Sequence, residues 1–197
     1  MKNLIYIFII VFAVNCKAQS PVINIRDWKG ENILNSYLKD TNNDLEAFEG
    51  TYIFTNADNI FKIKLKKVFT TRTARYYEDL IIGELEYKKG NTVFLNTLSK
   101  LDTVYNDQSS HLIEGNTILE NNEVPDCPDC TPNEIRLRLS IDDTREISAF
   151  YVKRTTVNGL PALKVFKQTF GPGWKTANTI VQPIIIRDGA YIFIKQP

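Results

Sequence analysis

Residues 61–66 read Phe61-Lys62-Ile63-Lys64-Leu65-Lys66, so that every apolar side chain is followed by a lysine. Because successive side chains of a β-strand point to opposite faces, this alternation predicts a strand with one buried and one solvated face. Residues 135–141 repeat the pattern with arginine, as Ile135-Arg136-Leu137-Arg138-Leu139-Ser140-Ile141. Antiparallel sheets commonly bury only one face, so both stretches indicate a mainly β protein built on an antiparallel sheet.

The same period extends outward from these stretches over most of the chain. It predicts about ten strands, the others lying at residues 51–55, 75–87, 92–98, 111–120, 147–155, 163–170, 180–187 and 190–195. Turn signals such as Lys89-Gly90-Asn91 and Arg187-Asp188-Gly189 separate neighbouring strands. We expect an antiparallel meander that closes into a barrel, with a β-sandwich as the alternative.

Two short helical turns are expected ahead of this sheet, at residues 31–40 and 43–48. Asn42 or Asn43 would cap the second turn, and Gly50 would close it. The sequence then continues as Phe48-Glu49-Gly50-Thr51-Tyr52, with an aromatic side chain two residues after the glycine. This order resembles the entrance to a lipocalin-type barrel, except that Tyr52 stands where tryptophan is usual, and the resemblance implies a lipocalin-like barrel.

The N-terminus reads as a secretory signal. Lys2 and Asn3 precede an apolar run at residues 4–14, which is followed by Asn15-Cys16-Lys17-Ala18-Gln19. A basic start, a short apolar run and a small-residue exit are typical of a signal peptide, and the run is shorter than the roughly 20 residues of a membrane-spanning helix. We therefore expect an exported protein, periplasmic or secreted.

Two processing routes fit this signal. Cleavage after Ala18 would leave small residues at Cys16 and Ala18 and would release a mature protein that starts at Gln19. Alternatively, the signal ends at residue 15 and Cys16 carries lipid, which would make an outer-membrane lipoprotein whose only membrane contact is the anchor. The expected organisation is a signal at 1–18 or 1–15, an N-terminal arm at 19–42 and a single β domain at 43–197.

Cys127 and Cys130 are the two thiols that remain once Cys16 is removed or modified. An even pair in an oxidising compartment predicts a disulfide, here one that shapes a loop rich in proline and aspartate. A redox role is disfavoured because Asp126 and Asp129 would oppose thiolate formation and no helix is expected to follow. A zinc site is disfavoured because His111 is the one histidine of the chain and zinc takes about four ligands.

The charge composition excludes a general attraction to nucleic acid. The chain has 24 Lys and Arg against 23 Asp and Glu, a formal net charge of +1, so no nucleic-acid partner is expected. The lysines at 62, 64 and 66 are interpreted as a solvated strand face, with Glu84 and Glu86 as cross-strand partners.

No catalytic constellation, cofactor motif or metal site is expected from the sequence. His111 has no nucleophile motif around it and is interpreted as a surface or strand-end histidine. Trp174 and Lys175, after Gly171-Pro172-Gly173, form a candidate recognition loop that could contact a partner. Large aromatics are mostly buried, so the favoured alternative is that Trp174 folds back to plug the barrel.

Several segments resemble a family of small exported proteins from Bacteroidota, chiefly flavobacteria, whose domain has no assigned function. They are Asn43-Asp44-Leu45-Glu46-Ala47-Phe48-Glu49-Gly50-Thr51-Tyr52, Tyr77-Glu78-Asp79-Leu80-Ile81-Ile82-Gly83-Glu84, Cys127-Pro128-Asp129-Cys130-Thr131-Pro132 and Ile194-Lys195-Gln196. The resemblance implies origin and export but no activity. The leading hypothesis is a non-enzymatic envelope protein that binds a small apolar ligand or a protein partner. The alternatives are a solid-core structural or interaction protein and a thiol oxidoreductase that uses Cys127.

Overall fold

A computed structural model describes residues 21–31, 33–120, 123–143, 146–173 and 186–197, with the side chains of Asp142 and Asp143 excepted. The signal segment with Cys16, the candidate recognition loop of Trp174 and Lys175, and most of the strand expected at 180–187 lie outside the described residues.

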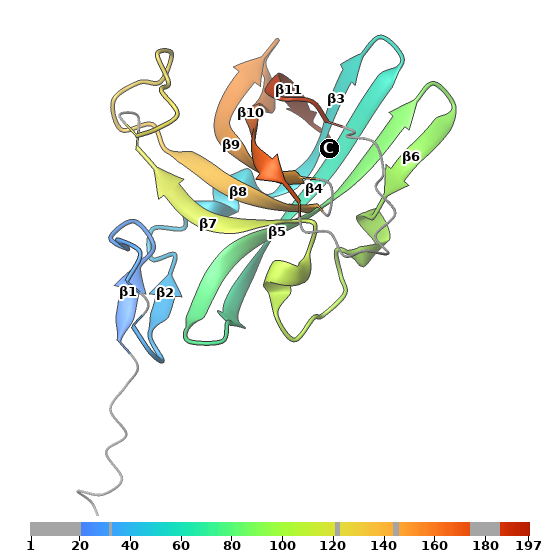
Figure 1. The fold of residues 1–197 in the computed structure, drawn as a ribbon. Helices are drawn as coiled ribbons and strands as arrows, with labels where there is room; N and C mark the ends of the chain where they lie inside the picture. Colours follow the sequence, from blue (N-terminus) through green and yellow to red (C-terminus); the bar gives the residue numbers. More distant parts are fainter. Residues whose placement is uncertain (1–20, 32, 121–122, 144–145, 174–185) are drawn as a thin grey trace, which may run out of the picture.

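Eight antiparallel strands form a closed barrel (Figure 1). They are β3 (Gly50–Asn56), β4 (Asn59–Arg72), β5 (Tyr77–Lys89), β7 (Ile113–Leu119), β8 (Arg136–Asp143), β9 (Glu146–Val157), β10 (Leu160–Pro172) and β11 (Gly189–Lys195). Their order around the barrel is β5-β4-β3-β11-β10-β9-β8-β7, and β7 pairs back onto β5. The predicted antiparallel barrel is confirmed, and the sandwich alternative is wrong.

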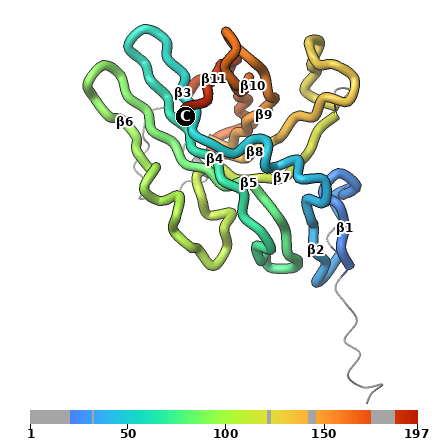
Figure 2. Tube along the Cα trace, turned by 180° about the vertical axis from the view of Figure 1, so that it is seen from behind, coloured from blue at the N-terminus to red at the C-terminus, as the bar shows by residue number. Residues whose placement is uncertain are grey.

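Three further strands lie outside the barrel ring: β1 (Val22–Asn24), β2 (Tyr37–Lys39) and β6 (Thr92–Asn96). β1 and β2 pair in parallel, and β2 pairs in parallel with the start of β5. Both views place β1 and β2 at the end of the barrel opposite to the β3–β4 and β5–β6 turns (Figures 1 and 2).

The helical turn expected at residues 31–40 is wrong, because this segment turns and then enters β2. Its backbone pairs with distant segments on both sides: Tyr37 N donates to Pro21 O, and Tyr77 N donates to Ser36 O. These bonds satisfy groups that a local helix would otherwise have to satisfy.

The second expected turn is confirmed as the 3-10 helix η1 (Leu45–Phe48). Its cap is not an asparagine, because the Asp40 carboxylate accepts hydrogen bonds from Asp44 N at 2.8 Å and Leu45 N at 2.9 Å. Two more 3-10 turns, η2 (Leu98–Lys100) and η3 (Gln108–Ser110), lie between β6 and β7.

The inward faces of the strands pack together into the core. Phe61, Ile63 and Leu65 are buried, as the alternation with lysine predicted, and Leu137 and Leu139 are buried between the arginines of β8. At the β3–β4 turn, aromatic rings close the barrel, with the centroids of Phe61 and Tyr87 4.5 Å apart.

The opposite end of the barrel is closed by η1, whose Leu45 and Phe48 are fully buried. Beneath it, Lys67 Nζ lies 2.7 Å from Asp40 Oδ2 in a buried ion pair. An eight-stranded barrel can be filled by its own side chains or can hold one small ligand. In the described residues, the buried apolar side chains of the barrel strands and of η1 form one main cluster.

Candidate functional site

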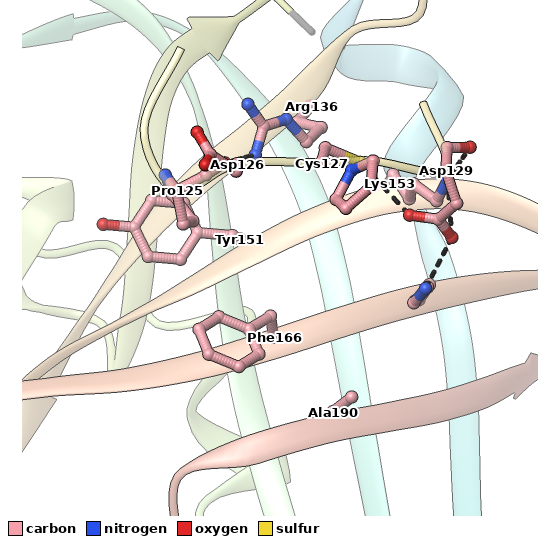
Figure 3. Close-up of a pocket in the computed structure, with 11 residues that line it drawn as sticks. Pro125, Asp126, Cys127, Asp129, Arg136, Tyr151, Lys153, Phe166 and Ala190 are labelled. Atoms are coloured by element: carbon pink, nitrogen blue, oxygen red, sulfur yellow. Dashed lines mark hydrogen bonds and ion pairs between the residues drawn. The ribbon is translucent and has the colours of Figure 1, made fainter. Parts of the chain in front are cut away.

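The candidate site is a groove of about 290 Å³ on the outside of the barrel. One wall is the loop at residues 125–129, and the floor is the outer face of β8 to β11 (Figure 3). Its lining residues are Pro125, Asp126, Cys127, Pro128, Asp129, Arg136, Tyr151, Lys153, Lys164, Phe166 and Ala190.

The floor of the groove is apolar because three outward side chains lie side by side across three strands. Tyr151 of β9 is in register with Phe166 of β10, and Phe166 is in register with Ala190 of β11. Phe166 keeps 41% of its surface exposed. This row was not predicted, although an aromatic side chain at an outward position of an alternating strand is a signal for such a surface.

A row of cations runs beside the apolar row. Lys153 and Lys164 are in register on β9 and β10, and Arg136 begins β8. The arginine stripe was predicted to be a solvated face, but Arg136 is only 4% exposed. That prediction is wrong for Arg136, because the loop folds over the start of β8 and covers it.

Arg136 and the two lysines anchor the loop to the barrel. The Arg136 guanidinium donates to the backbone oxygens of Pro125, Glu120 and Glu123. Lys153 Nζ donates to the backbone oxygen of Asp129 at 3.0 Å, and Lys164 Nζ lies 2.5 Å from the Asp129 carboxylate. Hydrogen bonding from Lys164, with Lys153 as a second donor, lowers the pKa of Asp129 to about 2, so this carboxylate is ionised at neutral pH.

The Sγ atoms of Cys127 and Cys130 lie 2.02 Å apart, the distance of a disulfide bond. Lys153 Nζ lies 3.9 Å from Cys130 Sγ, while an oxygen of Asp129 lies 3.5 Å from Cys127 Sγ. The neighbouring aspartates, which suggested an unfavourable setting for a thiolate, are thus accompanied by a cation that lies elsewhere in the sequence. Lys153 is 23 residues away along the chain, so only the fold reveals the contact.

His111 lies between η3 and β7 and is fully buried, so its interpretation as a surface residue is wrong while its strand-end position is confirmed. Its Nδ1 lies 2.8 Å from Glu84 Oε1, and its Nε2 lies 3.2 Å from Gln108 Oε1. Glu84 stands opposite Lys64 in register, as predicted, but it pairs with this histidine instead. The contact fastens the η3 segment to the outer face of β5.

A second, wider groove of about 620 Å³ lies between the outer face of β4 and residues 101–108. Phe69 and Val104 line it and are 66% and 89% exposed. Phe69 belongs to a β-bulge in β4, where the β-branched Thr70 has a φ of 51°.

Within the described part of the chain, no group of three or more His, Cys, Asp or Glu side chains is arranged to hold a metal ion. No helix of those residues is long and apolar enough to cross a membrane.

Residues 1–196 match the model of a family of unknown function (DUF6705), and the chain belongs to this family. The predicted resemblance to a family without assigned function is therefore confirmed, whereas origin from Bacteroidota and kinship with lipocalins stay predictions. Neither curated proteins nor solved structures give a significant match.

Proposed function

We propose that this chain is a non-enzymatic binding protein of the cell envelope that binds a small apolar ligand in the groove beneath the loop at residues 125–129. The observation that carries this proposal is the row of Tyr151, Phe166 and Ala190, which presents apolar surface to a defined concavity. Binding sites for small molecules are typically concave and mostly apolar, with a few polar groups at defined positions.

The packing of the lumen supports the groove over the barrel interior as the binding site. Phe48, Tyr52, Phe150 and Phe193 belong to the core cluster and are among the largest fully buried side chains. A ligand that took their place would have to displace them, whereas the outer groove is open to solvent.

The loop that forms the wall of the groove is held in place before any ligand arrives. Arg136 donates to Pro125 O, Lys153 donates to Asp129 O, and the disulfide to Cys130 closes a four-residue ring at the end of the loop. Because the loop is already ordered, ligand binding loses little conformational entropy there, which favours affinity. A groove of about 290 Å³ suits a ligand with a single ring.

Export is the other part of the proposal. It is supported by the signal-peptide pattern at the N-terminus and by a cysteine pair at disulfide distance, which suits an oxidising compartment. The protein would be periplasmic or secreted if cleaved after Ala18, or tethered to the outer membrane if Cys16 carries lipid.

Phenylbutanol is a suitable uncharged probe, and its binding can be followed by an NMR titration of backbone amides. We expect shifts confined to the 125–129 loop and the outer faces of β9 to β11. Phe166→Ala should weaken binding by about fivefold or more, because it removes the exposed ring at the floor. Phe69→Ala is the matched control, since Phe69 is also exposed but lies in the other groove.

Two results would contradict the proposal. One is binding that survives Phe166→Ala unchanged, and the other is a set of shifts centred on lumen residues such as Phe193. Absence of saturable binding by small apolar probes would favour the alternative, a solid-core interaction protein of the envelope.

A further inference from the structure

The two sulfur atoms of the disulfide lie in different surroundings. Of the two cysteines, only Cys127 lines the groove. Cys130 has the ammonium group of Lys153 3.9 Å from its sulfur. A cation beside a sulfur stabilises its thiolate, and a sulfur that forms a more stable thiolate leaves faster in thiol–disulfide exchange.

Lys153 is held where it can act on Cys130. Its side chain is 10% exposed, and it also contacts the carboxylates of Asp129 at 3.3 Å and Glu134 at 3.7 Å. The Asp129 carboxylate near Cys127 is shared by Lys153 and Lys164. An incoming thiolate at Cys127 therefore does not meet an uncompensated negative charge.

We propose that this disulfide exchanges with the cysteine thiols of a partner polypeptide, with Cys127 as the attacked sulfur and Cys130 as the leaving group. A partner thiolate attacks Cys127 Sγ, the Cys127–Cys130 bond breaks, and its electron pair passes to Cys130 beside Lys153. The product is a mixed disulfide between the partner and Cys127.

A second thiolate of the same partner completes the reaction by attacking the partner's own sulfur in the mixed disulfide. That bond breaks, Cys127 leaves as a thiolate, and water protonates it. The partner dithiol is thereby oxidised to a disulfide by two electrons, and Cys127 and Cys130 are reduced. The reverse sequence reduces a partner disulfide.

The groove would select the partner by the side chain next to its cysteine. Tyr151 and Phe166 line the same groove as Cys127, so an apolar side chain adjacent to the attacking cysteine can bind in the groove while the sulfurs meet. This part of the inference rests on the proposed function of the groove, and it names a cysteine-containing polypeptide as the ligand class.

The first experiment mixes the oxidised protein with acetyl-Phe-Cys-amide or acetyl-Gly-Cys-amide and follows the mixed disulfide by mass spectrometry. We expect Lys153→Met to slow formation about fivefold to tenfold with both peptides, because the leaving group loses its cation. Lys153→Arg should restore the rate. Lys66→Met is the matched control, since Lys66 pairs with Asp102 in the other groove, and its rate should stay within twofold.

The same experiment tests the partner specificity and the assigned roles of the sulfurs. The Phe peptide should react faster than the Gly peptide, and Phe166→Ala should remove that difference. Peptide mapping should find the mixed disulfide on Cys127. A rate that is insensitive to Lys153→Met, or a mixed disulfide mainly on Cys130, would overturn the assignment.

A second measurement separates an electrostatic role of Lys153 from a structural one. Cys127→Ser leaves Cys130 as a free thiol and Cys130→Ser leaves Cys127, and each thiolate is titrated by its ultraviolet absorbance. Adding Lys153→Met should move the Cys130 transition up by about one pH unit and leave the Cys127 transition unchanged. Movement of both transitions, or of neither, would contradict the inference.

Phenylbutanol binding in these variants distinguishes the two proposals. Normal binding together with failed exchange overturns only the redox inference. Failed binding with exchange that still depends on Lys153 overturns only the ligand site.

Discussion

At the scale of single residues, the half-buried Glu78 makes the stability of the fold depend on pH. Burial raises the pKa of its carboxyl to about 7, the hydrogen bond from Asn116 opposes this shift, and Glu114 and Asp107 add to it. Asn116 Nδ2 donates to Glu78 Oε2 at 2.7 Å. The folded protein therefore holds a proton on Glu78 at pH values where the unfolded chain has lost it.

This raised pKa predicts a stability that falls as the pH rises from about 4.5 to about 7, because ionisation is less favourable in the folded state. Glu78→Gln removes the ionisation and keeps an oxygen for Asn116. We expect the variant to be more stable by about 2 kcal/mol at pH 8 and unchanged at pH 4. Urea unfolding at both pH values checks this, and an equal gain at both would contradict it.

The residues that act through long-range contacts are those that the sequence could not reveal. Lys153 and Arg136 appear in the sequence as outward charges of alternating strands, which predicts solvation. Their roles depend on a loop that folds over β8 and β9, and the course of that loop is not encoded in a periodicity. His111 is the same case, because its buried ring pairs with Glu84 of β5, 27 residues away along the chain.

At the scale of elements, η1 and β4 are joined by one buried ion pair. The Asp40 carboxylate accepts from the first backbone amides at η1 and lies 2.7 Å from Lys67 Nζ, with side-chain exposures of 0% and 3%. The sequence predicted the turn at 43–48 from its spacing but assigned the cap to an asparagine. Asp40 was not predicted as the cap because it lies before the turn, in a segment expected to be helical.

Asp40→Asn and Lys67→Met should each destabilise the protein by about 3 kcal/mol, because each leaves the other charge buried without its counterion. The double variant should lose clearly less than the sum of the two. Urea unfolding of all four proteins gives the coupling energy. Additive losses would show that the pair does not fasten η1 to the barrel.

At the scale of the whole molecule, the sequence predicted the barrel because alternation sets which face of each strand is buried. A closed sheet also pairs the backbone of every strand on both sides and leaves no open edge. Closure itself depends on β7 pairing with β5, for instance Ile81 opposite Gly115. Gly115 has a φ of 150°, and a Cβ there would lie 2.8 Å from Arg138 O. Glycine is needed here because the backbones of two strands approach closely, and the alternating pattern of the sequence does not show which strands do so.

The disulfide lies outside this closed ring of strands, which predicts that the barrel tolerates its loss. Closing a four-residue ring removes little chain entropy, so Cys127→Ser with Cys130→Ser should cost at most about 2 kcal/mol. The far-ultraviolet circular dichroism should be unchanged, while phenylbutanol binding should weaken as the groove loses its fixed wall. Global unfolding of the double variant would mean that the disulfide staples the fold. A disulfide able to exchange with partner thiols requires a barrel that stays folded in both states, and the position of the 125–129 loop meets that requirement because the hydrogen-bonded ring of strands closes without it.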